Sequence, residues 1–370
     1  MRVTIERSAF LKALNHVQSV VERRNTIPIL SNVLVQAGAG KVRLTATDLD
    51  IEIVESVAAK VAKDGAATVP AHMLYDIVRK LPDGAQLELE QGPDSGRVSI
   101  FAGRSRFALQ ALPHEDFPDL AAGEPGHGFT LSAADLRGLI DKTRFAISTE
   151  ETRYYLNGIY LHEVPQAGLL RAVATDGHRL AQAQIARPEG AKGMPGVIVP
   201  RKTVLEIVKL IEGEEGDVEV ALSSSKIRFT AGNLMLTSKL IDGTFPDYER
   251  VIPRHNDKLL SVDTKVFSDA VDRVSTISME KGRAVKLNIS GGKLVLTVNN
   301  PDSGSAEEEI AASYDHDPID IGFNARYLLD VAGQIKSGTM NFSLADAGSP
   351  TIVRDPGDEQ ALYVLMPMRV

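Results

Sequence analysis

The sequence predicts an α+β protein made of three tandem copies of one unit, in which two helices pack on antiparallel sheets. Three observations predict this fold. A strand followed by an amphipathic helix recurs at three places, a second helix recurs later in each copy, and the segments between helices alternate apolar and polar residues. Each copy is roughly 125 residues long, which is within the usual range for a domain.

The first repeated element is an alternating strand that leads into a helix whose apolar residues fall at helical spacing. In each copy five positions separate the last apolar residue of the strand from the first apolar residue of the helix, as in the pairs Ile5 and Phe10, Leu131 and Leu136, and Val262 and Phe267. Equal offsets at three places favour a repeated unit over coincidence.

The second repeated element opens at Val69, Val199 and Phe323. An acidic residue follows seven positions later in every copy, and the three acids are Asp76, Glu206 and Asp330. Proline or asparagine comes directly after the opening residue, which suits the start of a helix. The two elements together predict helices at 6–24, 70–81, 132–144, 200–211, 263–273 and 324–336.

The remaining segments are typical of strands with one wet face, because polar residues alternate with apolar ones. The clearest of them are 1–6, 41–46, 106–111 and 293–298. Two breaks divide the copies, a turn-rich stretch at 121–128 and a second one at 253–257. The expected domains are therefore 1–123, 128–254 and 255–370.

Composition excludes several classes of protein. With 43% hydrophobic and 24% charged residues, the chain has the balance of a soluble globular protein of two or three domains. It has no apolar run near the roughly 18 residues of a membrane span and no secretory leader pattern. Cysteine is absent, which excludes disulfides, thiolate catalysis and zinc–thiolate sites. We expect a cytoplasmic protein.

Charge is unevenly distributed along the chain. The six expected helices carry a net charge of +6, so the rest must carry −14 to give the total of −8. Basic residues often just decorate solvated helix faces. Their recurrence over several helices also favours a surface that faces a polyanion, such as the phosphates of a nucleic acid.

Two segments are candidates for chemistry. Asp176 and His178 form an Asp/His pair that a hydrolase could use, although Asp176 and Gly177 also suit a simple turn between strands. Residues 38–41 resemble a phosphate loop, but Val35 and Val42 stand where that motif needs glycine and serine or threonine. We expect no catalytic residue, no cofactor and no metal.

The C-terminal segment 363–370 is apolar and contains Met366 and Met368. It suits an edge strand that closes the last sheet. Its methionines also suit an adaptable apolar surface that binds a peptide. Both interpretations can hold together.

Several motifs, spread in order over all three copies, resemble one family, that of the bacterial DNA polymerase III beta subunit, the replicative sliding clamp. The motifs are Ile27-Pro28-Ile29-Leu30, Thr47-Asp48-Leu49, Gly103-Arg104-Ser105-Arg106-Phe107, Arg153-Tyr154-Tyr155-Leu156-Asn157-Gly158, Ala174-Thr175-Asp176-Gly177-His178-Arg179-Leu180, Phe245-Pro246-Asp247-Tyr248 and Met366-Pro367-Met368-Arg369.

The resemblance implies three DNA-clamp domains per chain and a head-to-tail homodimer closed into a ring around double-stranded DNA. It implies a non-catalytic processivity factor in DNA replication. Its partners would be the DNA polymerase III catalytic subunit, the clamp loader, and other polymerases and repair proteins, bound through short apolar motifs. No membrane is involved.

The resemblance also assigns site residues. DNA-binding positions would be Arg24, His72, Glu150, Tyr154 and Tyr155. The peptide groove would be formed by Leu156, Thr175, Gly177, His178, Arg179, Leu180, Pro246, Arg250, Val251, Asn324, Tyr327, Val364, Met366, Pro367, Met368 and Arg369. The dimer interface would use Phe107 and Leu109 against Thr276 and Ile277.

This chain departs from better-known clamps at a few of these positions. His72 and Glu150 stand where those clamps have arginine and glutamine, and Glu150 would repel phosphate. The groove rim carries Gly282, Gly348 and Pro350, so we expect partner preference to shift there. Thr276 would weaken the ring slightly.

Two other classes of function remain open from the residues alone. A hydrolase would lose turnover when His178 is replaced by alanine. A repeat scaffold that never touches DNA would not depend on Arg24 or on the Tyr154–Tyr155 pair.

Overall fold

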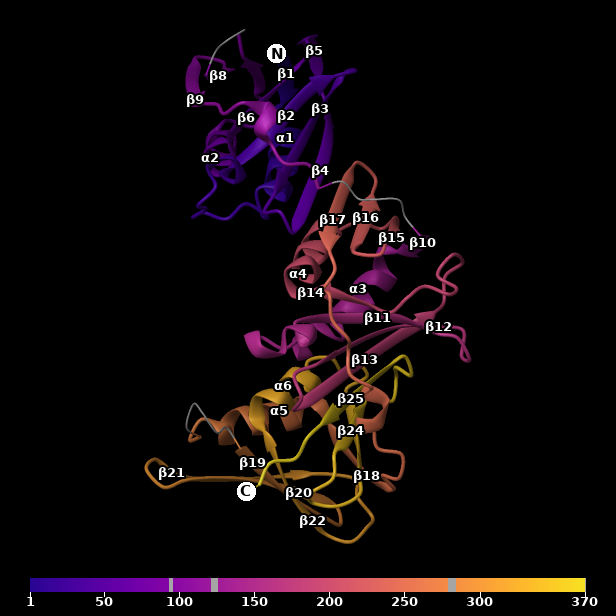
Figure 1. The fold of residues 1–370 in the computed structure, drawn as a ribbon. Helices are drawn as coiled ribbons and strands as arrows, with labels where there is room; N and C mark the ends of the chain where they lie inside the picture. The colour runs from indigo at the N-terminus through magenta and orange to yellow at the C-terminus, as the bar shows by residue number, and fades with distance from the viewer. Residues whose placement is uncertain (93–95, 121–125, 279–283, 370) are drawn as a thin grey trace. The chain divides into compact units, whose positions relative to one another are not determined.

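The structure is a computed structural model that describes residues 1–92, 96–120, 126–278 and 284–369 (Figure 1). Contacts divide the chain into two compact units. Unit 1 comprises Met1–Arg137, Pro188–Lys192 and Lys202–Leu240, and unit 2 comprises Gly138–Arg187, Gly193–Arg201 and Ile241–Val370. Among the described helices, none has the length and apolarity needed to cross a membrane.

Unit 1 contains two sheets. The five-stranded sheet has the order β5 (Lys60–Lys63), β1 (Arg2–Glu6), β7 (Gln86–Glu90), β8 (Arg97–Ala102) and β9 (Ser105–Gln110). The eight-stranded sheet has the order β10 (His127–Ser132), β15 (Asp217–Leu222), β16 (Lys226–Ala231), β17 (Leu234–Lys239), β4 (Ile51–Ala58), β3 (Lys41–Thr47), β2 (Asn32–Gly38) and β6 (Gly65–Pro70).

Unit 2 also contains two sheets. Its eight-stranded sheet has the order β14 (Val197–Pro200), β11 (Gly158–Val164), β12 (Leu169–Thr175), β13 (Arg179–Ala186), β25 (Ala361–Leu365), β24 (Thr351–Arg354), β23 (Thr339–Leu344) and β18 (Lys258–Asp263). Its four-stranded sheet has the order β21 (Gly304–Ala311), β20 (Lys293–Asn300), β19 (Ala284–Ser290) and β22 (Ile319–Asn324).

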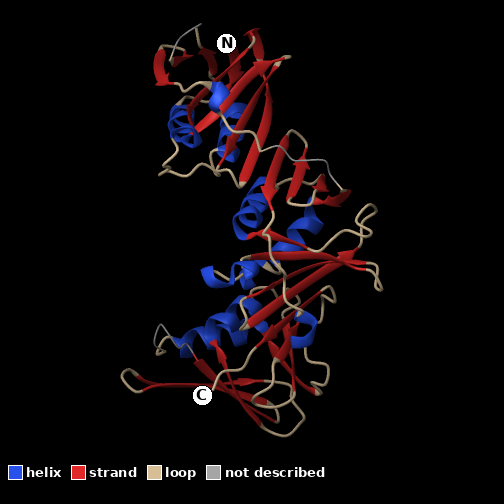
Figure 2. Cartoon of the chain, in the orientation of Figure 1, coloured by secondary structure: helices blue, strands red, loops and turns tan. Residues whose placement is uncertain are grey.

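Two pairs of helices pack on these sheets, which agrees with the α+β prediction (Figure 2). α1 (Arg7–Val17) contacts α2 (Ala71–Lys80), β3 and β4, and α5 (Thr264–Ser275) contacts α6 (Ala325–Ala332), β20 and β21. α3 (Ala133–Asp141) and α4 (Arg201–Leu210) contribute residues to both units. Short 3-10 turns are η1 (Pro28–Ser31), η2 (His114–Asp116), η3 (Arg144–Ala146), η4 (Glu151–Leu156) and η5 (Tyr248–Val251).

Local sequence explains where the helices begin. The Asp263 side chain accepts a hydrogen bond from the Val266 N–H at the start of α5, and Asn324 accepts from Arg326 and Tyr327 at the start of α6. These are ordinary N-caps, since they satisfy amides that have no partner inside the helix. The expected capping role of the asparagine is confirmed.

Five of the six helices are shorter than the sequence predicts, and this changes where the charge lies. The largest change is at α3, which ends at Asp141 and leaves Lys142 and Arg144 outside. α1 ends at Val17, so Arg23 and Arg24 belong to the loop that follows it. α6 ends at Ala332, which leaves Lys336 outside. Counted over the six described α-helices the net charge is +4, against −12 for the rest of the chain. The segregation of charge persists, but it is weaker than expected.

Strands of neighbouring copies pair with one another. β17 of the second copy pairs with β4 of the first, and β25 of the third copy pairs with β13 of the second. Both eight-stranded sheets therefore cross the boundary between copies, which is why contacts define two units in a chain with three repeats. The C-terminal strand β25 lies between β24 and β13, so the expectation of an edge strand there was wrong.

The hydrogen bonds of one turn confirm the repeat atom by atom. Thr47 Oγ1 donates to Ile51 O at 2.8 Å and accepts from the Leu49 N–H, and Thr175 Oγ1 makes the same two bonds with Arg179 O and the Gly177 N–H. In each turn the next residue is an aspartate that caps two more amides. Both turns place their third residue at positive φ, 77° for Leu49 and 88° for Gly177.

Candidate functional site

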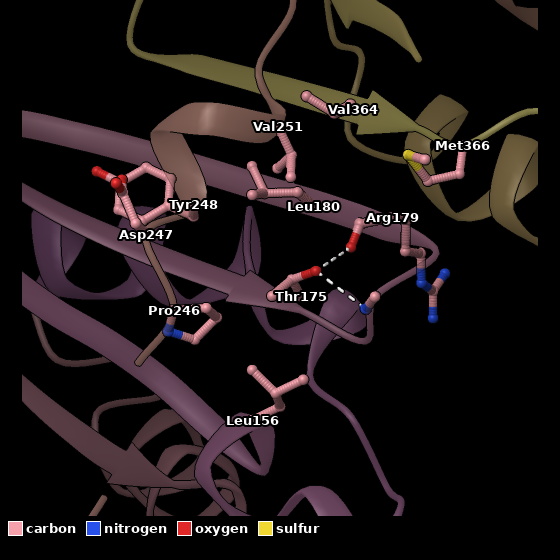
Figure 3. Close-up of a pocket in the computed structure, with 11 residues that line it drawn as sticks. Leu156, Thr175, Arg179, Leu180, Pro246, Asp247, Tyr248, Val251, Val364 and Met366 are labelled. Carbon is pink, nitrogen blue, oxygen red and sulfur yellow. Dashed lines mark hydrogen bonds between the residues drawn. The ribbon is translucent and has the colours of Figure 1, made fainter. Parts of the chain in front are cut away.

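An apolar cavity of about 180 Å³ opens on unit 2 beside the second copy of this turn (Figure 3). Leu180, Val251 and Val364 form one wall, and Leu156 and Pro246 lie at the opposite side. The cavity rests on a cluster of buried residues that belongs to the core of the unit. Val251 and Met366 remain 46% and 38% exposed at its mouth. Exposed apolar side chains around an apolar hollow are typical of a site that receives apolar groups of a partner.

The elements of two copies build this cavity. β12, the turn at 175–178 and β13 come from the second copy, and β25 comes from the third. β13 and β25 pair antiparallel, and Leu180 of β13 lies opposite Val364 of β25. The side chains of these two residues therefore meet where the second and third copies join. The backbone then continues past the strand, where the Met366 N–H donates to His178 O at 2.9 Å.

Arg179 forms a rigid polar border to the cavity. Its guanidinium donates to Asp176 Oδ2 at 3.1 Å and to Asp330 Oδ2 at 2.5 Å, and it stacks over the ring of Tyr327 at 4.2 Å. A third nitrogen donates to Phe145 O. The residue is only 8% exposed, so its charge is satisfied by partners within the unit and not by solvent. Burial raises the pKa of the Tyr327 hydroxyl, which therefore stays neutral.

The predicted groove residues fall into three groups. Those that line the cavity are Leu156, Thr175, Gly177, Arg179, Leu180, Pro246, Val251, Val364 and Met366. Asn324 and Tyr327 lie at the start of α6, where Tyr327 joins the site through its contact with Arg179. The structure does not place His178, Arg250, Pro367, Met368 or Arg369 in the lining.

The five residues outside the lining are exposed or half-buried. Arg250 is exposed and pairs with Asp247 at 2.6 Å. The Met368 N–H donates to Gly322 O at 2.8 Å, which fixes the tail on β22. Arg369 is exposed.

Sequence reasoning missed Asp247 and Tyr248 as lining residues. Both belong to the motif 245–248, so a signal for them was present. Of the residues expected at the groove rim, Pro350 accepts a hydrogen bond from Asn256 at 2.8 Å and the Gly348 amide is capped by Asp346, and neither residue lines the cavity. Gly282, the third rim position, lies outside the described residues.

The Asp/His pair is not assembled for catalysis. Both oxygens of Asp176 are used by the backbone of its own turn and by the Arg179 side chain. The hydrogen bond with His178 involves the backbone amide of that residue and not its ring. Within the described ranges, no group of three histidine or acidic residues could hold a metal ion.

The positions expected to contact DNA are divided between the units. In unit 1, Arg24 is exposed in the loop after α1. His72 lies on α2, and its Nε2 bonds to the Val21 carbonyl at 2.9 Å, so its ring ties α2 to that loop.

In unit 2, Tyr154 is 53% exposed on η4, and its ring meets that of Tyr155 edge-on at 5.8 Å. Glu150 pairs with Arg153 at 2.6 Å, and the hydrogen bond from Arg153 lowers the pKa of its carboxyl group. The charge of Glu150 is thereby offset next to the tyrosines.

The expected interface residues also lie in different units. Phe107 and Leu109 are on β9, which is an edge strand of its sheet. Thr276 and Ile277 follow α5, where the Ile277 carbonyl accepts from Asn300 at 2.8 Å. Thr276 is exposed, and its hydroxyl donates a hydrogen bond to Asp272 O at 3.2 Å.

Comparison with known proteins matches the whole chain to one family. Sequence profiles of the DNA polymerase III beta subunit match at residues 1–121 for the N-terminal domain, 130–247 for the central domain and 249–369 for the C-terminal domain.

Individual relatives agree with this match. The chain is 56% identical to the beta sliding clamp of Caulobacter vibrioides and 40% identical to that of Escherichia coli, with both chains fully covered in each comparison. A crystal structure of a sliding clamp from Bartonella birtlesii bound to griselimycin superposes with a TM-score of 0.97 at 58% identity, again over both full chains. This chain therefore belongs to the DNA polymerase III beta subunit family, the bacterial beta sliding clamps.

Proposed function

We propose that this chain is a non-catalytic sliding clamp that closes as a homodimeric ring around double-stranded DNA and tethers the replicative polymerase and other replication proteins. The observation that carries this proposal is the full-length match to the beta subunit family together with an apolar cavity at the joint of two repeats. Tethering is topological, so it requires no catalytic residue.

The repeat itself supports a head-to-tail ring. In the chain, β17 pairs with β4 and β25 pairs with β13, which are two copies of one joint. By its place in the repeat, β9 of the first copy corresponds to β17 and β25, and β21 of the third copy corresponds to β4 and β13. Both β9 and β21 are edge strands of their sheets. A free edge is a template for strand pairing. We assign β9 of one subunit to β21 of the next.

The register of these two strand pairs supports one register for the pairing between subunits. Leu236 lies opposite Ile53, and Tyr363 lies opposite Ala181. When the hairpins of the three copies are aligned by their strand registers, Phe107 on β9 corresponds to Leu236, and Ala306 on β21 corresponds to Ala181. An antiparallel pairing with this register places Arg106 directly opposite Glu307 of the neighbouring subunit. Opposite charges on facing residues stabilise a sheet.

For DNA, we assign the phosphate contacts to Arg24, Tyr154 and Tyr155, which are exposed or half-buried in this chain. Such contacts would bind any sequence, since phosphates carry no base information. His72 and Glu150 take supporting roles, because their side chains already hold Val21 and Arg153.

The cavity bounded by Leu180, Val364 and Met366 is the proposed groove for apolar motifs of the polymerase, the clamp loader and repair proteins. Tyr327 and Asn324 would extend it beyond Arg179. Because a clamp of this family acts on chromosomal DNA, we place the protein in the cytoplasm.

The test is retention on nicked circular DNA after loading with the clamp loader of the same organism and ATP. We expect the protein to stay on the nicked circle and to leave when a restriction enzyme linearises the DNA, because a ring can slide off over a DNA end. Equal retention on circular and linearised DNA would contradict the proposal and would indicate ordinary surface binding.

A further inference from the structure

Tyr248 is the aromatic side chain in the lining of the apolar cavity, and its hydroxyl group is fully used by partners behind that lining. The oxygen accepts a hydrogen bond from Arg171 Nη1 at 2.9 Å and lies 2.9 Å from His162 Nε2. The residue is only 5% exposed. The ring can therefore move only if these two bonds change.

The proton positions in this network follow from one contact. His162 Nδ1 lies 2.8 Å from the Glu163 carbonyl oxygen, which can only accept, so Nδ1 carries the proton. Nε2 is then an acceptor and receives the Tyr248 hydroxyl proton. Burial lowers the pKa of His162, so the ring is neutral at pH 7 and keeps this arrangement.

On its other side, the Tyr248 hydroxyl is held by the guanidinium group of Arg171. Arg171 donates from Nη1 to Glu249 at 3.0 Å as well as to Tyr248, and from Nε and Nη2 to Gln184. The planar guanidinium is thus held at several points and cannot follow Tyr248 if the ring shifts.

Aromatic stacking also supports the His162 ring. His162 stacks on Tyr160 with centroids 4.6 Å apart, and Tyr160 stacks on Phe245 at 4.8 Å. Phe245 meets Tyr248 edge-on at 6.4 Å, so these rings lead back to the cavity lining. The histidine is held by packing on one side and by hydrogen bonds on the other.

We propose that His162 and Arg171 are positioning residues that hold Tyr248 as a fixed wall of the cavity and thereby set its affinity for apolar peptide motifs. The inference deepens the proposed function and rests on it. Neither residue is part of the cavity lining, so each acts through Tyr248.

The experiment measures binding of a fluorescein-labelled peptide from the clamp-binding segment of the DNA polymerase III catalytic subunit by fluorescence polarisation. We expect His162→Ala to weaken binding by roughly fivefold, the effect of one hydrogen bond. His162→Gln should restore affinity to within about twofold, because its amide oxygen accepts the same hydroxyl proton.

A double-mutant cycle separates positioning from general damage. Tyr248→Phe removes the hydrogen bonds with both His162 and Arg171, so it should cost at least as much as His162→Ala. The double variant should be no weaker than Tyr248→Phe alone, because that single change already removes the bond to His162. His114→Ala, on η2 in unit 1, is the matched histidine control and should bind like the wild type. Thermal unfolding of each variant reports whether it is folded.

Three outcomes would decide against the inference. These are wild-type binding by His162→Ala, losses that multiply in the double variant, and a glutamine variant no better than alanine. If His162→Ala does not fold, the comparison of Tyr248→Phe with His162→Gln keeps the test open to refutation. Absence of binding by the wild-type chain would contradict the proposed groove itself.

Discussion

At the scale of single residues, Asp355 shows how a buried carboxylate can stabilise a loop. Its Oδ2 accepts from the amides of Lys336 and Ser337 at 2.6 and 3.1 Å, and its Oδ1 accepts from Gly357 at 2.8 Å. Burial by itself would raise the pKa of Asp355, but the hydrogen bonds from Ser337, Lys336 and Gly357 outweigh it and lower the pKa to about 2.

This lowered pKa predicts an acid-sensitive contribution to stability. The folded-state pKa lies below the unfolded one, so the contribution is complete above about pH 4 and is lost as the pH falls toward 2. We expect Asp355→Asn to lower the free energy of unfolding at pH 7 by about 2 kcal/mol, and the difference from wild type to shrink below pH 4. Denaturant unfolding at several pH values measures it, and a constant difference would contradict the assignment.

Glu52 is the opposite case. It occupies the position in the first copy that Leu180 occupies in the second, and it is 7% exposed. Its Oε2 accepts the Leu120 amide at 3.2 Å. Burial raises the pKa of Glu52, so the charged form is disfavoured in the folded state. The first joint thus carries a buried acid where the second has an apolar groove wall.

We expect Glu52→Gln to raise the free energy of unfolding at pH 7 by about 1 kcal/mol, because the amide still accepts the Leu120 N–H without a buried charge. The raised pKa means that wild type regains stability as the pH falls, so the advantage of the variant should disappear near pH 4. Glu219→Gln, an exposed strand residue, is the control. A glutamine variant that is less stable at pH 7 would contradict this account.

At the scale of elements, the assignment of β9 to β21 of the neighbouring subunit makes a charge prediction. Arg106→Glu and Glu307→Arg should each weaken dimerisation by about tenfold, because like charges would then face each other across the strands. The double exchange should restore dimerisation. Sedimentation velocity over a concentration series measures these dissociation constants.

The control for this seam is Lys63→Glu on β5, the other edge strand of the same sheet, which should leave the dimer unchanged. If the double exchange dimerises no better than the singles, the register is wrong. If all three variants dimerise like wild type, the seam does not use these strands.

At the scale of the whole molecule, a chain with a net charge of −8 should depend on closure and not on attraction to stay on DNA. We expect binding to a short linear duplex to fall by about tenfold or more between 0.05 and 0.2 M salt, because phosphate contacts release counterions. Retention on the nicked circle should hardly change over the same range. Equal salt sensitivity of the two would argue against a closed ring.

The repeat and the fold class were predictable from sequence because they depend on local spacing. Five-residue offsets, the acid seven residues into the second element and the caps at Asp263 and Asn324 all act within one copy. The turn at 175–178 was also predictable, since its hydrogen bonds join residues at most four apart. Most of the residues that line the cavity were named by the family resemblance, which depends on those same motifs.

Tertiary structure alone decided the distant partners of two of the three repeated acids, whereas Asp76 pairs locally with Arg79. Glu206 accepts the Ser19 hydroxyl of the preceding copy at 2.6 Å, and Asp330 binds Arg179 of the copy before its own. Equal spacing could not reveal these partners, because they lie 187 and 151 residues away in the chain. The same holds for the pairing of β13 with β25 and for the support of Tyr248 by His162. Contacts between distant segments depend on how whole sheets join, and local sequence does not encode that join.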